Sequence, residues 1–154
     1  KAYEIFHAEQ NFTQAKKVHL TSTAQQQLVL LSNNQKPDQS IYILIAQNGY
    51  IAKINCAHYP NICLDEYNKQ QTRQIQTLDL VHVGNFKYIQ NVAFTDSRTQ
   101  QAKTLNYPEH QIKQFYLEDV ANLKYVVFGG CLVALAAMYV SIRIIRNFKS
   151  FLNK

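Results

Sequence analysis

The chain contains no tryptophan, one methionine, three prolines and only four glycines in 154 residues. Two of those glycines, Gly129 and Gly130, lie in a long apolar run, so no glycine-rich phosphate-binding loop is present. This absence excludes the common nucleotide-binding motifs. No other catalytic or cofactor-binding motif is recognisable. The sequence therefore predicts a protein that is not an enzyme and that binds no cofactor.

Cysteine is also scarce, with three residues, and Cys131 lies inside the apolar run, where we expect inert packing. The other two flank a histidine in the pattern Cys56-x-His58-x4-Cys63. One residue between Cys56 and His58 is tighter than the usual spacing of a zinc ligand pair, and a fourth ligand would have to come from elsewhere. A metal is therefore not predicted. A disulfide between Cys56 and Cys63, which needs an oxidising compartment, and two free buried thiols both remain open.

Acidic residues are absent after Asp119. Residues 1–124 carry twelve basic and ten acidic side chains, a net charge of +2, whereas residues 125–154 carry four basic and no acidic ones, a net charge of +4. Apart from Lys16-Lys17, no basic cluster alternates with aromatic residues in the first part of the chain, so nucleic-acid binding is not expected. The charge distribution fits an anionic membrane surface better.

The longest uncharged run covers residues 125–142, between Lys124 and Arg143. As a helix, these eighteen residues would span about 27 Å, close to the hydrocarbon thickness of about 30 Å. The long side chains of Lys124 and Arg143 can reach the headgroups and close the difference. A buried core helix is the alternative, but a domain this small rarely hides a helix that is apolar on every face. We therefore predict one transmembrane helix.

Small residues follow one side of this predicted helix at the spacing i, i+4, i+7 and i+11, namely Gly130, Ala134, Ala137 and Ser141. Bulkier residues occupy roughly the opposite side, namely Phe128, Leu132, Leu135, Tyr139 and Ile142. Small side chains let two helix backbones approach closely, and packing drives helix association in lipid. The pattern predicts a helix-packing face, although small residues are also common in membrane helices in general.

Residues 143–154 form a basic tail in which Arg143, Arg146 and Lys149 recur every three positions among apolar residues. Together with Lys124, these side chains are predicted to contact lipid headgroups, and anionic lipids such as cardiolipin are the expected partners. The tail either lies along the leaflet as an amphipathic segment or continues the span as a stop signal. It holds four basic residues, against two in residues 109–124, which predicts the tail on the matrix or cytosolic side and the preceding domain on the opposite face.

The region before the span is predicted to be mainly β. Asn48-Gly49 separates two β-rich runs and is a strong hairpin signal, and Gly84-Asn85 separates two more, with glycine in the position that a type II′ turn requires. We expect an antiparallel meander or small sandwich of about six strands, at residues 17–23, 27–31, 41–46, 51–55, 77–83 and 86–94.

A helix is expected to begin near Pro108-Glu109, because proline is favoured at the first helical position. Residues 95–106 are expected to be a polar linker. The predicted organisation is a soluble β-rich domain at residues 1–105, a juxtamembrane amphipathic helix at 106–124, a transmembrane helix at 125–142 and the basic tail at 143–154.

These features predict a non-catalytic accessory subunit of a hetero-oligomeric membrane complex. The chain begins with Lys1, which indicates either a removed targeting peptide or an incomplete start. The respiratory chain and the ATP synthase of the mitochondrial inner membrane are the expected hosts, with other membrane subunits as partners. The alternative is a membrane-anchored β-domain binding module, such as an adaptor, receptor or assembly factor. An enzyme or electron carrier built around Cys56, His58 and Cys63 is the least supported interpretation.

Overall fold

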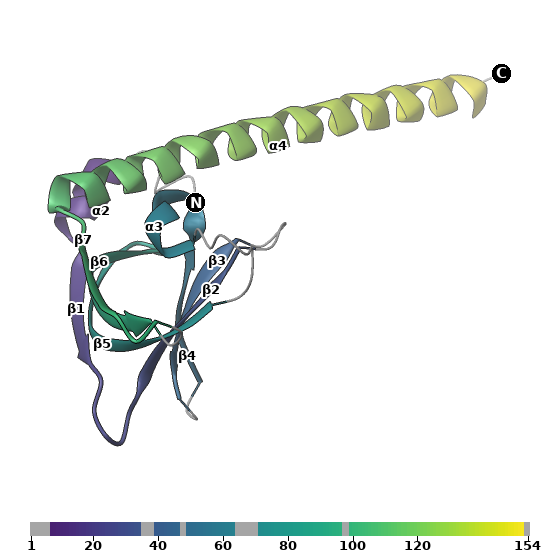
Figure 1. Cartoon of the computed structure of the whole chain (residues 1–154). Helices are drawn as coiled ribbons and strands as arrows, with labels where there is room; N and C mark the ends of the chain where they lie inside the picture. Colours follow the sequence, from purple (N-terminus) through teal and green to yellow (C-terminus); the bar gives the residue numbers. More distant parts are fainter. Residues whose placement is uncertain (1–6, 35–38, 47–48, 64–70, 97–98, 153–154) are drawn as a thin grey trace. The chain divides into compact units, whose positions relative to one another are not determined.

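The computed structural model describes residues 7–34, 39–46, 49–63, 71–96 and 99–152, with side chains described up to residue 148 (Figure 1). Two units can be separated: Glu9–Tyr116, which contains the sheet, and Leu117–Lys154 together with Lys1–Ala8. The elements in order are α2 (Ala8–Thr13), β1 (Lys16–Thr21), β2 (Leu28–Asn33), β3 (Ser40–Ile45), β4 (Gly49–Asn55), the 3-10 helix η1 (Cys56–His58), α3 (Pro60–Cys63), β5 (Gln71–Val83), β6 (Phe86–Asp96), β7 (Ala102–Asn106) and α4 (Glu109–Leu152).

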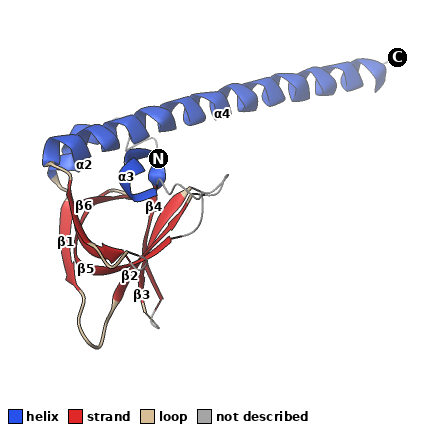
Figure 2. Cartoon of the chain, in the orientation of Figure 1, coloured by secondary structure: helices blue, strands red, loops and turns tan. Residues whose placement is uncertain are grey.

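Seven antiparallel strands form one sheet in the order β4-β3-β2-β5-β6-β7, and β1 also pairs with β5 (Figure 2). The thirteen-residue β5 organises the sheet. Its first half pairs with β2, with Ile75 opposite Leu28, and its second half pairs with β1, with Leu80 opposite Val18. Because β6 pairs with β5 along nearly its full length, β1 and β2 lie one after the other along the opposite side of β5. The predicted antiparallel β fold, followed by an apolar C-terminal helix, is confirmed.

Irregular pairing curls this sheet. The register of β5 against β6 shifts between Ile75 and Thr77, and that of β3 against β4 shifts between Ile43 and Leu44. Such bulges bend a strand and increase its twist. The curl brings β4 toward β6, where the Lys87 ammonium donates a hydrogen bond of 3.0 Å to the carbonyl oxygen of Ile51. Lys87 thereby provides a partner for a backbone carbonyl on the outermost strand.

Aliphatic side chains fill the interior of the curled sheet. On β2 the burial alternates residue by residue, as expected for a strand with one face on the core. The largest fully buried aliphatic residues come from four strands, from α3 and from the first turn of α4: Leu30, Ile41, Ile43, Ile62, Ile75, Leu78, Leu80, Ile89 and Ile112. Most of the strand residues among them are isoleucines, whose β-branched side chains favour strands.

The two predicted turns differ in how much of them is described. Residue 48 of the predicted Asn48-Gly49 turn lies outside the described residues, whereas Gly49 has φ +102°. Gly84 has φ +57°, and the only non-glycine residue with positive φ in the described part of the chain is Gln100. Asn85 therefore has negative φ, which fits the predicted type II′ turn.

The predicted linker at residues 95–106 is wrong. β6 extends to Asp96, and Ala102–Asn106 forms β7, which pairs with β6 from Thr95 to Asn91. Four of the five side chains of β7 are exposed, so no hydrophobic alternation marks this edge strand in the sequence. β5 likewise begins at Gln71, six residues before the prediction, because its first residues are mostly polar. Backbone pairing defines both segments, and hydropathy does not detect it.

Candidate functional site: the apolar helix and the disulfide cap

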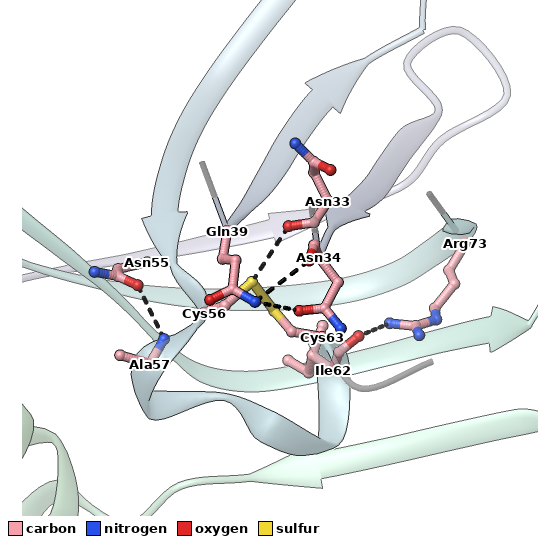
Figure 3. The surroundings of a disulfide bond; sticks show 9 residues. All are labelled: Asn33, Asn34, Gln39, Asn55, Cys56, Ala57, Ile62, Cys63 and Arg73. Atoms are coloured by element: carbon pink, nitrogen blue, oxygen red, sulfur yellow. Dashed lines mark hydrogen bonds between the residues drawn. A yellow bond between two sulfur atoms is a disulfide. The ribbon is translucent and has the colours of Figure 1, made fainter. Parts of the chain in front are cut away.

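Cys56 and Cys63 form a disulfide bond that closes a short loop of the sheet unit (Figure 3). Cys56 is the first residue of η1 and Cys63 the last residue of α3, with Cα atoms 5.8 Å apart, a normal separation for a disulfide. We call residues 56–63 the disulfide cap. Both half-cystines are buried, with 8% and 4% of their surface exposed. The bond uses the two sulfurs that the alternative metal site would need, so the geometry favours the disulfide over a metal ion.

Hydrogen bonds fix the disulfide cap to the sheet at both of its ends (Figure 3). At the start, the side-chain oxygen of Asn55 accepts a bond from the backbone N–H of Ala57 at 3.0 Å, as an N-cap does. At the end, the guanidinium of Arg73 on β5 donates to the carbonyl oxygen of Ile62 at 2.7 Å. Arg73 is 4% exposed and also lies over the ring of Phe94, 5.2 Å from its centroid. A charged group therefore helps to hold α3 from inside the fold.

Tyr59 anchors the middle of the disulfide cap. Its side chain is fully buried, and its hydroxyl accepts a bond from the N–H of Ile89 at 2.8 Å and donates to the carbonyl oxygen of the same residue at 3.2 Å. Its ring packs edge to face against Tyr107 and Phe115, with centroids 5.0 and 5.7 Å apart. His58 stacks on Phe115 at 4.4 Å. The cap is thus packed against the beginning of α4 by aromatic contacts and against β6 by the Tyr59 hydroxyl.

α4 is the second feature with functional meaning. It is the only helix in the described ranges that is long and apolar enough to cross a membrane, with a mean hydropathy of 2.1 over its most apolar window. None of this window is buried. Tyr125, Val126 and Val133 are each at least 70% exposed. A core helix would hide these side chains, so α4 fits the transmembrane helix of a single-pass membrane protein.

The predicted packing residues Gly130, Ala134, Ala137 and Ser141 are all exposed in the described chain. A Cβ atom added at Gly130 would meet no other atom within 4 Å. The Ser141 hydroxyl donates to the carbonyl oxygen of Ala137 at 2.8 Å, so this polar group has a partner inside its own helix. The small face is therefore open to a neighbouring helix.

The predicted headgroup residues lie at the two ends of the apolar segment. Lys124 precedes it, and the side chains of Arg143 and Arg146 follow it and are exposed. The side chain of Lys149 lies outside the described part. α4 continues without a break to Leu152, so the basic tail extends the same helix.

A polar row on the outer face of the sheet escaped sequence reasoning, because it depends on the register of three strands. His19 on β1 lies opposite Asp79 on β5, which lies opposite Asn91 on β6. The imidazole Nδ1 of His19 is 2.5 Å from one carboxylate oxygen of Asp79, and the amide of Asn91 donates to the other at 2.9 Å. These contacts, first that from Asn91 and then that from His19, lower the pKa of Asp79 below its ordinary value of 3.8.

The pKa of Asp79 predicts how stability depends on pH. A carboxylate whose pKa is lower in the folded state stabilises the fold above its unfolded pKa, and this contribution is lost as the pH falls through the folded pKa. The wild-type chain is therefore expected to unfold at a higher urea concentration than Asp79→Asn near neutral pH, with a smaller difference at about pH 3. Urea midpoints of both proteins at the two pH values test this. A difference that does not change with pH would show that ionised Asp79 adds nothing.

A cleft of about 500 Å³ lies where β1 and β2 meet along β5. Its lining is uncharged and consists mainly of hydroxyl and amide side chains, including Thr21, Ser22, Gln74, Thr77 and Thr95. The loop between β1 and β2 is held there by the N–H of Ser22, which donates to the carbonyl oxygen of Gln76 at 2.9 Å.

Comparison with protein-family models, with curated proteins and with solved structures finds no match for this chain.

Proposed function

We propose that this chain is a non-catalytic accessory subunit of a larger membrane complex. The observation that carries the proposal is the small face of α4, which no part of the described chain covers. Within lipid, apolar side chains gain nothing by leaving the bilayer, so helices associate through close packing between backbones. A face of glycine, alanine and serine is suited to that packing. The partner would be a transmembrane helix of another subunit.

The disulfide cap supports an orientation for the proposed subunit. A disulfide bond persists in an oxidising compartment and is rare in a reducing one. The excess of basic residues after the span favours the opposite, inner side for the tail. Both signals are satisfied when the β domain faces an oxidising space and the tail faces the interior. In the mitochondrial inner membrane, the proposed location, these sides are the intermembrane space and the matrix.

The respiratory chain and the ATP synthase are the proposed hosts. Both contain many transmembrane helices against which a single span can pack. Within the described residues, the small face of α4 and the outer surface of the sheet are available for contact. The disulfide cap is held to the sheet by Arg73 and Tyr59, so the domain can form such contacts without first becoming ordered.

Fractionation of the native membrane in mild detergent tests the proposal. We expect the full-length chain to co-migrate with one large complex at a fixed stoichiometry, because helix packing of this kind survives extraction. Quantitative mass spectrometry of the fractions, with a known complex as size standard, measures it. A chain recovered mostly as a free pool would contradict the accessory-subunit proposal.

A membrane-anchored binding module is the second candidate, and the cleft beside β5 favours it. An uncharged lining of hydroxyl and amide groups can hydrogen-bond a neutral polar ligand or an extended peptide without selecting for charge. The two proposals give different results in the same fractionation. A binding module would be recovered largely free, and its association with partners would be substoichiometric.

A further inference from the structure

The C-terminal part of α4, just after the apolar segment, carries a polar cluster on one side of the helix. At about 100° per residue, Tyr139, Arg143, Arg146 and Asn147 fall within about a 100° sector of the helix circumference. Together with Ile142 they line a groove of about 330 Å³. All five residues belong to one helix, so their positions around and along its axis are fixed whenever the helix is formed.

The two arginines of this groove have no anion within the described chain. Neither Arg143 nor Arg146 forms an ion pair with a described residue. No aspartate or glutamate follows Asp119 in the sequence, so the segment itself cannot supply one. Two guanidinium groups one helical turn apart repel each other unless an anion lies between them. Both arginines are therefore available to an anion from outside the described chain.

The position along the helix indicates where that anion comes from. The groove begins at Tyr139, near the end of the apolar segment, and continues four residues past Arg143. In a membrane this is the depth of the phosphate groups, where tyrosine rings also accumulate. Guanidinium presents a planar set of donors that binds phosphate oxygens in pairs, and the Asn147 amide adds a further donor.

The opposite side of the same helix is the small face. Gly130, Ala134, Ala137 and Ser141 are centred about 180° from Tyr139. Phe128, Leu132 and Leu135 lie above the groove on its own side, and their bulk suits contact with lipid chains. The helix thus has one side for a packed partner and another for lipid, and both can be occupied at once.

We propose that Tyr139, Arg143, Arg146 and Asn147 form a binding site for the phosphodiester headgroup of an anionic phospholipid. The two arginines contact the phosphate, and the amide of Asn147 donates a hydrogen bond to it. The ring of Tyr139 packs against the part of the acyl chains nearest the headgroup, with its hydroxyl toward the headgroup. This site rests on the membrane-anchored function proposed above. Of the four basic residues expected to contact lipid headgroups, it assigns the specific contact to Arg143 and Arg146.

The test uses the full-length chain reconstituted in phosphatidylcholine vesicles with trace spin-labelled phosphatidylglycerol or phosphatidylcholine. Electron paramagnetic resonance measures the selectivity of the motionally restricted lipid for the anionic species. Because each arginine near the surface contributes about a fivefold preference, Arg143→Gln with Arg146→Gln is expected to reduce the selectivity about 25-fold. The Lys149→Gln, Lys154→Gln pair removes the same charge from the same tail and leaves both arginines in place. If the arginine pair forms a specific site, this control should lower the selectivity less than the arginine double variant does.

The controls decide between this site and its alternatives. Equal losses from both double variants would overturn the site in favour of a diffuse attraction to the tail. Arg143→Lys with Arg146→Lys keeps the charge, and full retention of selectivity would overturn the role of the paired guanidinium donors. Loss of selectivity on adding inorganic phosphate would show a free-anion site in place of a lipid site.

The same vesicles separate this proposal from the accessory-subunit proposal. Ala134→Leu is expected to leave lipid selectivity unchanged, because it lies on the opposite side of the helix. The arginine variants are expected to keep their co-migration with the large complex in native fractionation. Loss of lipid selectivity in Ala134→Leu would overturn the division of α4 into two sides.

Discussion

Replacing Cys56 and Cys63 together by serine is expected to lower the melting temperature of the β domain by about 8–15 °C. The bond joins residues seven positions apart, and closing so short a loop stabilises a fold by about 2–3 kcal/mol. Each 1 kcal/mol shifts the melting temperature of a domain near 100 residues by about 4–5 °C. Circular dichroism of the full-length chain in detergent, recorded at the β-sheet minimum, measures the change.

Three comparisons make this result specific to the disulfide cap. A reducing agent added to the wild-type chain should reproduce the shift of the double variant and should not affect the variant itself. Cys131→Ser, which removes the exposed cysteine of α4, should leave the melting temperature unchanged. If the wild-type protein purified from its own membrane melted at the temperature of the variant, the cysteines would be reduced there, and the oxidising orientation would be wrong.

The effect of the double variant is expected to be concentrated in the cap. Arg73 and Tyr59 keep their hydrogen bonds to Ile62 and Ile89 without the disulfide, so the strands are expected to remain paired. Cys56 and Cys63 become free to separate, and the backbone amides between them are expected to exchange faster with solvent. Core amides of β5 and β6 exchange through global unfolding, so they should speed up only by the lost stability of about 2–3 kcal/mol. Amides of the cap that exchange no faster than these would show that the effect is not concentrated in the cap.

Much of the fold follows from local patterns in the sequence. The β3 and β4 strands are rich in isoleucine, and Gly49 and Gly84 provide the backbone conformations that their turns need. The start of α4 follows from Pro108, and its apolar character follows from hydropathy alone. In each case the residues that determine the structure are neighbours in the chain, so a local pattern is sufficient.

Other parts depend on residues that are distant in the sequence. β7 contributes backbone hydrogen bonds to β6 while its side chains stay in solvent, so its composition matches that of a loop. Arginine is normally found at the surface. Arg73 is nevertheless buried, because its guanidinium bonds to the carbonyl of Ile62 and lies over the ring of Phe94. The contact of His19 with Asp79 depends on a strand register across sixty residues. No local pattern encodes these pairings.

The candidate sites divide in the same way. The small face of α4 and its basic end are visible in the sequence, because helical periodicity relates residues that are close in the chain. The pairing of Cys56 with Cys63 could be proposed from spacing but not chosen over free thiols, since the choice depends on whether the η1–α3 turn brings the sulfurs together. The cleft beside β5 was not predicted, because it is formed where two separate strands meet a third.

Gly130→Leu and Ala134→Leu are expected to release the chain from its complex while leaving it in the membrane. A leucine on the small face would separate the two backbones by the width of a side chain and remove the close contacts on which association in lipid depends. It would also make the helix more apolar, so insertion should not suffer. Native fractionation measures the share of each variant that co-migrates with the complex, and carbonate extraction measures the share that remains in the membrane.

The chain offers matched controls for both substitutions. Gly129→Leu and Ala136→Leu make the same chemical changes at positions more than about 100° around the helix from the centre of the small face. A Cβ atom at Gly129 or Gly130 meets nothing within 4 Å, so neither glycine is required by the helix itself. The control variants should therefore assemble like wild type, and any difference from Gly130→Leu must come from a partner. Equal loss in all four variants would show that helix composition matters and the face does not, whereas normal assembly of all four would place the contact with the complex on the β domain.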